Sequence, residues 1–86
     1  MDVNDEIIQL GEGLKGRLEP SLIDFALGYI THVEAILAFE TLCDYIADYN
    51  VKLRKDEYEK IINTATKFGL SIDIRYTYIN PERHQN

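Results

Sequence analysis

Apolar residues recur at spacings of three and four along most of the chain, which is the period of an α-helix. Residues 5–17 predict a first helix, with one face formed by Ile7, Leu10, Leu14 and Leu18. Pro20 suits the first position of a second helix. The inner face of that second helix would be formed by Leu22, Phe25, Ala26 and Ile30.

A third helix is predicted from residue 31 to about residue 49. Thr31 and Glu34 fit a capping box, in which each side chain accepts a hydrogen bond from the other residue's backbone amide. The apolar positions that follow cover about 200° of the helix surface, which is wide for a surface helix. We therefore expect this helix to lie at the centre of the fold, with the lone cysteine, Cys43, as a buried and inert thiol.

A fourth helix is predicted over residues 55–68, and Gly69 would be its C-cap. Its inner face would be formed by Tyr58, Ile61, Ile62, Ala65 and Phe68. In the connection before it, residues 50–55, we expect Val51 and Leu53 to pack against the core.

Residues 71–79 allow two interpretations. The alternation of Ile72, Ile74, Tyr76 and Tyr78 is typical of a strand, whereas Ser71 as a cap before Ile72, Tyr76 and Ile79 suits two helical turns. No other segment alternates well enough to be a partner strand, so a short helix is favoured. The sequence thus predicts an all-α fold: one domain, residues 1–86, built as a small bundle of four to five short helices around a central third helix, with residues 80–86 as a polar tail.

The composition favours a small globular protein. The chain has 86 residues, of which 45% are hydrophobic and 28% charged, as expected for one domain with a packed core. The first residues lack the basic region and apolar run of a signal peptide. No apolar run approaches the length of a membrane span. These features predict a cytoplasmic protein.

The residues that enzymes use are sparse. The only histidines are His32, at a predicted helix start, and His84, in the tail. A nucleophile with an adjacent base, a phosphate-binding glycine loop and the Glu-x-x-His pairs of a di-iron bundle are all missing from the sequence. We therefore expect no enzymatic activity, no cofactor and no metal site.

Charge is unevenly distributed along the chain. The net charge is −6, and residues 18–51 contain six acidic residues and no Lys or Arg. Such a field repels nucleic acid and anionic membranes and attracts a basic partner. Solubility alone is the other interpretation.

The third helix concentrates this charge in one stripe. At about 100° per residue, four carboxylates fall within an arc of about 120° that also contains Leu37: Glu34, Glu40, Asp44 and Asp48. Like charges four residues apart destabilise a helix, as does Asp48 in its last turn. An uncompensated stripe favours a binding surface. The alternative is that Lys52 or Arg54 neutralises Asp48 and leaves an ordinary solvated face.

Tyrosine is the second signal, with six among 86 residues and no tryptophan. Tyr45 and Tyr49 flank the acidic stripe, and Tyr76 and Tyr78 lie near the C-terminus. Tyrosine is enriched at protein interfaces because it buries a large area with little loss of rotamer entropy. The alternative is that these tyrosines cover a small core.

Residues 33–45, with Asp48, Tyr49 and Val51 after them, resemble the MafI family of bacterial immunity proteins. Those proteins have a Glu followed by an Ala-Leu-Glu-x-Leu-Cys-Asp-like helix and an acidic-Tyr-x-Val turn. Residues 57–61 and 68–70 are similar to the family as well, so residues 33–70 contain the match. Phe39 stands where the family often has Leu.

This resemblance implies a helical protein that binds and neutralises the C-terminal toxin domain of a secreted or contact-dependent inhibition system, often an EndoU-like ribonuclease. Because Glu34, Glu40 and Asp44 belong to the shared pattern, they are expected to serve the fold rather than the recognition of one toxin. Specificity is then expected from Asp48, Leu37, Tyr45 and the segment from Tyr76 to Tyr78. Our hypothesis is one-to-one capping of a basic nuclease toxin that blocks RNA entry. The toxin-binding residues would be Leu37, Glu40, Asp44, Tyr45, Asp48, Tyr49, Tyr76 and Tyr78.

Two other classes remain open. A small DNA-binding transcriptional regulator would need basic residues on one helix. Residues 55–67 contain Lys55, Lys60 and Lys67, but Asp56, Glu57 and Glu59 offset them. The third class is an interaction module unrelated to toxins.

Overall fold

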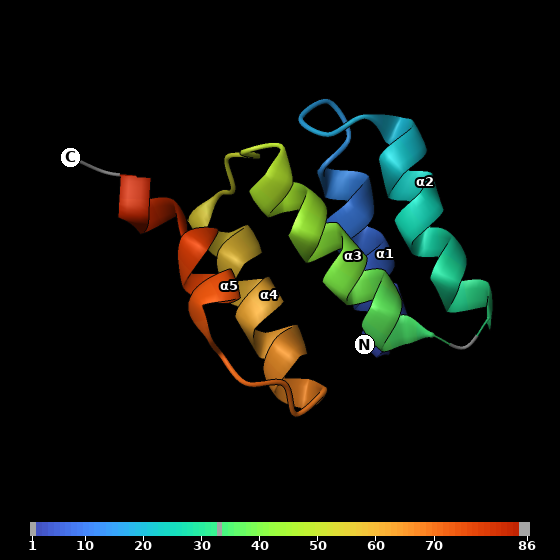
Figure 1. Cartoon of the computed structure of the whole chain (residues 1–86). Coiled ribbons are helices and arrows are strands. Elements are labelled where there is room, and N and C mark those ends of the chain that lie inside the picture. The colour runs from blue at the N-terminus through green and yellow to red at the C-terminus, as the bar shows by residue number, and fades with distance from the viewer. Residues whose placement is uncertain (1, 33, 85–86) are drawn as a thin grey trace. The chain divides into compact units, whose positions relative to one another are not determined.

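The computed structural model describes residues 2–32 and 34–84. Within those residues the chain forms five α-helices and two 3-10 helices, and it contains no strand (Figure 1). The predicted all-α fold is therefore confirmed for the described part of the chain.

The chain divides into two compact units, Met1–Val51 and Lys52–Asn86. The N-terminal unit contains α1 (Val3–Gly13), α2 (Pro20–Gly28), the 3-10 helix η1 (Tyr29–His32) and α3 (Ala35–Asp48). The C-terminal unit contains α4 (Lys55–Lys67), α5 (Ile74–Tyr78) and the 3-10 helix η2 (Pro81–His84).

In the N-terminal unit, α3 packs against both α1 and α2 (Figure 1). The buried side chains of α3 are Ala38, Phe39, Leu42, Cys43 and Ile46. They recur at spacings of three and four, so they form one face of the helix. Within this unit α3 is the inner helix, as predicted. Cys43 is buried as expected.

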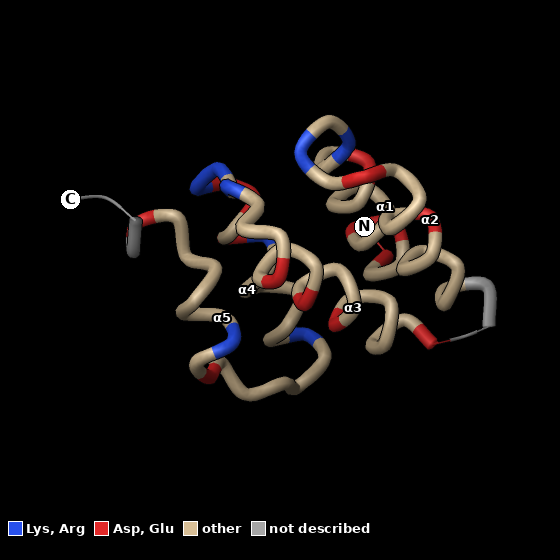
Figure 2. The backbone as a smooth tube through the Cα atoms, turned by 45° about the horizontal axis from the view of Figure 1, so that its top comes forward, with Lys and Arg blue, Asp and Glu red and all other residues tan. Residues whose placement is uncertain are grey.

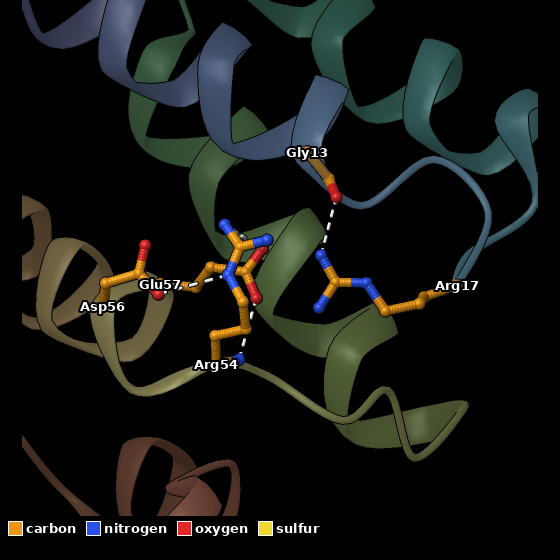
Figure 3. A network of polar contacts seen from close by, with 5 residues as sticks. All are labelled: Gly13, Arg17, Arg54, Asp56 and Glu57. Atoms are coloured by element: carbon orange, nitrogen blue, oxygen red, sulfur yellow. Dashed lines mark hydrogen bonds and ion pairs between the residues drawn. The ribbon is translucent and has the colours of Figure 1, made fainter.

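Helix α1 is shorter than the sequence predicted, because it ends at Gly13 and not near Arg17. Gly16 adopts a left-handed conformation with φ of 96°, which glycine reaches without steric strain. The Arg17 side chain donates to the Gly13 carbonyl at 2.6 Å and so satisfies one of the terminal acceptors (Figure 3). Leu14 and Leu18 are nevertheless buried, so the predicted apolar face continues beyond the helix.

The buried face of α2 differs from the predicted one. Pro20 occupies the first turn as expected, but Phe25 is 59% exposed and Ile23 is fully buried. The reason is Gly11 of α1, where an added Cβ would lie 3.1 Å from Leu27 Cδ1 and 3.2 Å from Ile23 Cγ2. Because glycine lets the two helices approach so closely, the Ile23 side of α2 faces inward and Phe25 faces outward.

Helix α3 begins at Ala35 and not at Thr31, so the predicted capping box does not start it. Residues 29–32 form η1 instead, and the Glu34 amide donates to the Tyr29 carbonyl at 3.0 Å. Glu34 is the N-cap residue and makes no side-chain capping hydrogen bond. The Thr31 hydroxyl, on which the prediction depended, lies outside the described side chains.

In the C-terminal unit, α4 has the predicted bounds to within one residue, and Ile61 and Ala65 of its inner face are buried. Leu53, before the helix, is buried as expected. Gly69 follows the helix with φ of 73°, which confirms it as the residue that ends α4.

Residues 74–78 form the helix α5, so the helical interpretation of this segment is confirmed. Its cap is Asp73, which accepts from the Arg75 amide at 3.0 Å, and not Ser71 as predicted. The predicted polar tail is structured over residues 81–84, as η2, which contacts α4. Lys55 and Glu82 lie 3.9 Å apart across this contact.

Candidate protein-binding surface

The outward side of α3 combines carboxylates with apolar and aromatic side chains. We call it the α3 face and define it by six of the predicted site residues: Leu37, Glu40, Asp44, Tyr45, Asp48 and Tyr49. Leu37 is 41% exposed, Tyr49 is 59% exposed, and Asp44 and Asp48 are also exposed. Glu40 and Tyr45 are half-buried. Leu37, Glu40, Asp44 and Asp48 thus lie within an arc of about 80° on one helix surface. Tyr45 and Tyr49 lie at the edge of that surface, near the C-terminal end of the helix.

The helical repeat explains why these residues are brought together. Leu37, Asp44 and Asp48 lie within an arc of about 40° at 100° per residue, on the side of the helix away from the buried Phe39 and Cys43. The Thr41 hydroxyl, in the same row, donates to the Leu37 carbonyl at 2.7 Å. Packing of the apolar side against α1 and α2 therefore fixes which carboxylates point outward.

The charge of the N-terminal unit is strongly negative. It contains ten acidic and two basic residues, which makes its net charge −8, whereas the C-terminal unit has five acidic and seven basic residues. Figure 2 shows that α2 and α3 have acidic positions and no Lys or Arg. The α3 face lies in this field.

Arg54, one of the two residues considered as a neutralising partner of Asp48, forms ion pairs with other carboxylates. Arg54 lies 3.2 Å from Asp56 and 3.8 Å from Glu57, and both contacts are within the C-terminal unit (Figure 3). Arg54 also holds the pKa of the Asp56 carboxyl below its ordinary value, chiefly through the side-chain hydrogen bond. Glu40 and Asp44 interact with other groups of the protein. Asp48 has no ion pair among the residues that the structure describes.

The two tyrosines of the α3 face contact each other. Their ring centroids are 6.2 Å apart and the ring planes meet at 65°, which is an edge-to-face arrangement. Tyr45 is half-buried and Tyr49 is the more exposed of the two. One ring is thus held against the protein and supports the other.

The two predicted site residues of α5 differ in exposure. Tyr78 is 39% exposed, but Tyr76 is only 2% exposed, so the prediction of a surface contact by Tyr76 is corrected. Once the segment is helical, position 76 faces inward and position 74 faces outward. Ile74, which sequence reasoning missed, is accordingly 83% exposed. The α5 residues belong to the C-terminal unit, whereas the α3 face belongs to the N-terminal unit.

Across residues 2–32 and 34–84, no three His, Cys, Asp or Glu side chains are grouped as ligands of a metal ion. The side chains of His32 and His84, the two histidines weighed from the sequence, lie outside the described part. Among the described helices, none has the length and apolar character needed to cross a membrane.

No protein-family model matches the chain, and neither a curated protein nor a solved structure matches it. The likeness of residues 33–70 to MafI immunity proteins therefore stays a prediction from the sequence. The function of the chain has to be inferred from the geometry and charge of the α3 face.

Proposed function

We propose that this protein is an immunity protein that binds a basic nuclease toxin through the α3 face and so prevents RNA from entering the enzyme. One observation carries the proposal. Exposed carboxylates at positions 44 and 48 share a helix surface with Leu37, and the exposed Tyr49 caps the end of that helix, in a unit of net charge −8.

The partner should be cationic because of this charge. A nuclease that binds the RNA backbone needs Lys and Arg side chains directed at phosphates, and carboxylates form the same charge-assisted hydrogen bonds with them. Asp44 and Asp48 are about 6 Å apart along the helix axis. The α3 face therefore suits the cationic groove of such an enzyme.

Affinity should come mainly from the apolar and aromatic members of the face. Leu37 and Tyr49 are large side chains that lose solvent contact on binding, and aromatic anchors are the common hot spots of interfaces. The surrounding charge raises the association rate by about 10–10³-fold and is screened by salt. The resemblance to the MafI family supports a toxin, with an EndoU-like ribonuclease as the expected class.

A DNA-binding regulator is less well supported. All three acidic residues of α4 lie between Lys55 and Lys60, and Lys55 is close to Glu82. A gel shift at low salt tests this alternative directly, because phosphate contacts give strong binding there. We expect no shift.

The toxin proposal is tested with the double variant Asp44→Lys and Asp48→Lys and the toxin domain encoded beside this chain's gene. Association is followed by stopped-flow at 50 and 300 mM NaCl. We expect the rate at low salt to fall by about 10-fold or more and its salt dependence to weaken. The matched control, Asp5→Lys with Asp24→Lys, changes the same number of exposed charges on α1 and α2.

Two results would contradict the proposal at different levels. Equal rates for the two double variants would mean that the α3 face has no special role in docking. A neighbouring gene with no toxin domain, or a toxin whose ribonuclease activity persists with excess protein, would remove the immunity function itself.

A further inference from the structure

The C-terminal end of α3 combines three features that favour a cation. The Asp48 carboxylate is exposed in the last turn of the helix. The helix has no basic residue in that turn, so the negative end of its dipole is not compensated from within the turn. Beside it lies the edge-to-face pair of Tyr45 and Tyr49.

This helix end is well ordered by its own hydrogen bonds. The Val51 amide donates to the Ile46 carbonyl at 3.0 Å, and the Asn50 amide donates to the Ala47 carbonyl at 3.3 Å. Together they form a Schellman motif, with Asn50 in the left-handed conformation at φ of 51°. Tyr49 and Asp48 thus lie at a helix end whose backbone is closed by hydrogen bonds within the protein.

The aromatic pair distinguishes between possible cations. Tyr49 is 59% exposed, so part of its ring is accessible to a partner. A guanidinium group is planar, stacks on aromatic rings and can pair with a carboxylate through two parallel hydrogen bonds. An ammonium group is more strongly hydrated and lacks that planar stacking.

We propose that Asp48, Tyr45 and Tyr49 form a subsite for an arginine side chain presented by a protein partner. Asp48 supplies the carboxylate, the tyrosine pair supplies the stacking surface, and the helix end adds negative potential. The subsite deepens the proposed function by naming the partner's side chain, and it rests on that function only for the identity of the partner.

The experiment titrates the ¹⁵N-labelled full-length protein with N-acetyl-arginine-N-methylamide and, separately, with the corresponding lysine compound. We expect the arginine compound to shift the amide signals of residues 45–51 and to bind a few-fold more tightly than the lysine compound. Asp48→Asn and Tyr49→Leu should each weaken arginine binding by about threefold, the size expected for one exposed ionic or cation–π contact.

Matched controls are Asp24→Asn and Phe25→Leu, which change an exposed acid and an exposed aromatic residue on α2. Arginine binding should be unchanged in both. Equal affinity for the two compounds, shifts spread over all acidic helices, or binding unaffected by Asp48→Asn and Tyr49→Leu would each overturn the subsite. Because no toxin is present, this result is independent of whether the immunity function holds.

Discussion

At the scale of single residues, Glu57 shows how a charged side chain can belong to the buried part of the protein. Its side chain is 6% exposed. One carboxylate oxygen accepts from the Arg54 amide at 2.8 Å, and the other lies 3.8 Å from the Arg54 guanidinium (Figure 3). The carboxylate therefore satisfies a backbone donor where α4 begins, a position at which the helix dipole also favours negative charge.

We expect Glu57→Ala to lower the free energy of unfolding by about 1–2 kcal/mol, because it removes this capping acceptor from a buried position. Urea unfolding followed by circular dichroism measures the change. Glu59→Ala is the control, since Glu59 is exposed on the same helix, and we expect its effect to stay within about 0.5 kcal/mol. Equal losses for the two variants would show that the contacts of Glu57 are not important for stability.

At the scale of helices, α3 and α4 end with the same hydrogen-bond motif but with different residues. After α4, Leu70 donates to Ala65 at 2.9 Å and Gly69 donates to Thr66 at 3.0 Å. Gly69 takes the left-handed position there, which Asn50 takes after α3. Asparagine tolerates this conformation better than most residues with a Cβ, yet less well than glycine.

Substitutions at the two helix ends should therefore differ in effect. Gly69→Ala is expected to lower the free energy of unfolding by about 1 kcal/mol, because a Cβ is strained at φ of 73°. No other group lies near that Cβ, so the loss would come from the backbone alone. Asn50→Gly should be neutral or slightly stabilising. Thermal unfolding of both variants tests this, and a neutral Gly69→Ala would contradict the role of the left-handed position.

At the scale of the whole molecule, charge is the dominant feature. Ten of the fifteen acidic residues, but only two of the nine basic ones, lie in residues 1–51. Repulsion among the acidic residues of that unit opposes folding. A binding function gives a physical reason for this excess of negative charge, because a cationic partner lowers the electrostatic free energy of the unit on association.

Salt should consequently stabilise the isolated protein. Raising NaCl from 20 to 500 mM shortens the screening length several-fold. We expect the free energy of unfolding to increase by up to about 1 kcal/mol, or roughly 4–8 °C in Tm. NaCl and NaI should act in the same direction if screening is the cause. A decrease in stability with added NaCl would indicate that attractive ion pairs dominate.

Much of the helical plan could be predicted from the chain alone. The end of α3 and the bounds of α4 follow from the spacing of apolar residues, because that spacing is a local property. The acidic surface of α3 was predictable for the same reason. Once one side of a helix is apolar, its carboxylates must lie on the other side. The helical state of residues 74–78 followed instead from the lack of a partner strand elsewhere in the sequence.

Which apolar side chain is buried was decided by the tertiary structure. On α2 the sequence pattern predicted an inner Phe25 and did not indicate Ile23, whereas the close approach permitted by Gly11 buries Ile23 and leaves Phe25 exposed. In the same way, the burial of Tyr76 leaves Ile74 exposed. Sequence periodicity therefore determined the helices and the acidic side of α3. Only packing determined the rotation of each short helix, because a turn or two of helix offers several apolar faces of similar size and its neighbours select one.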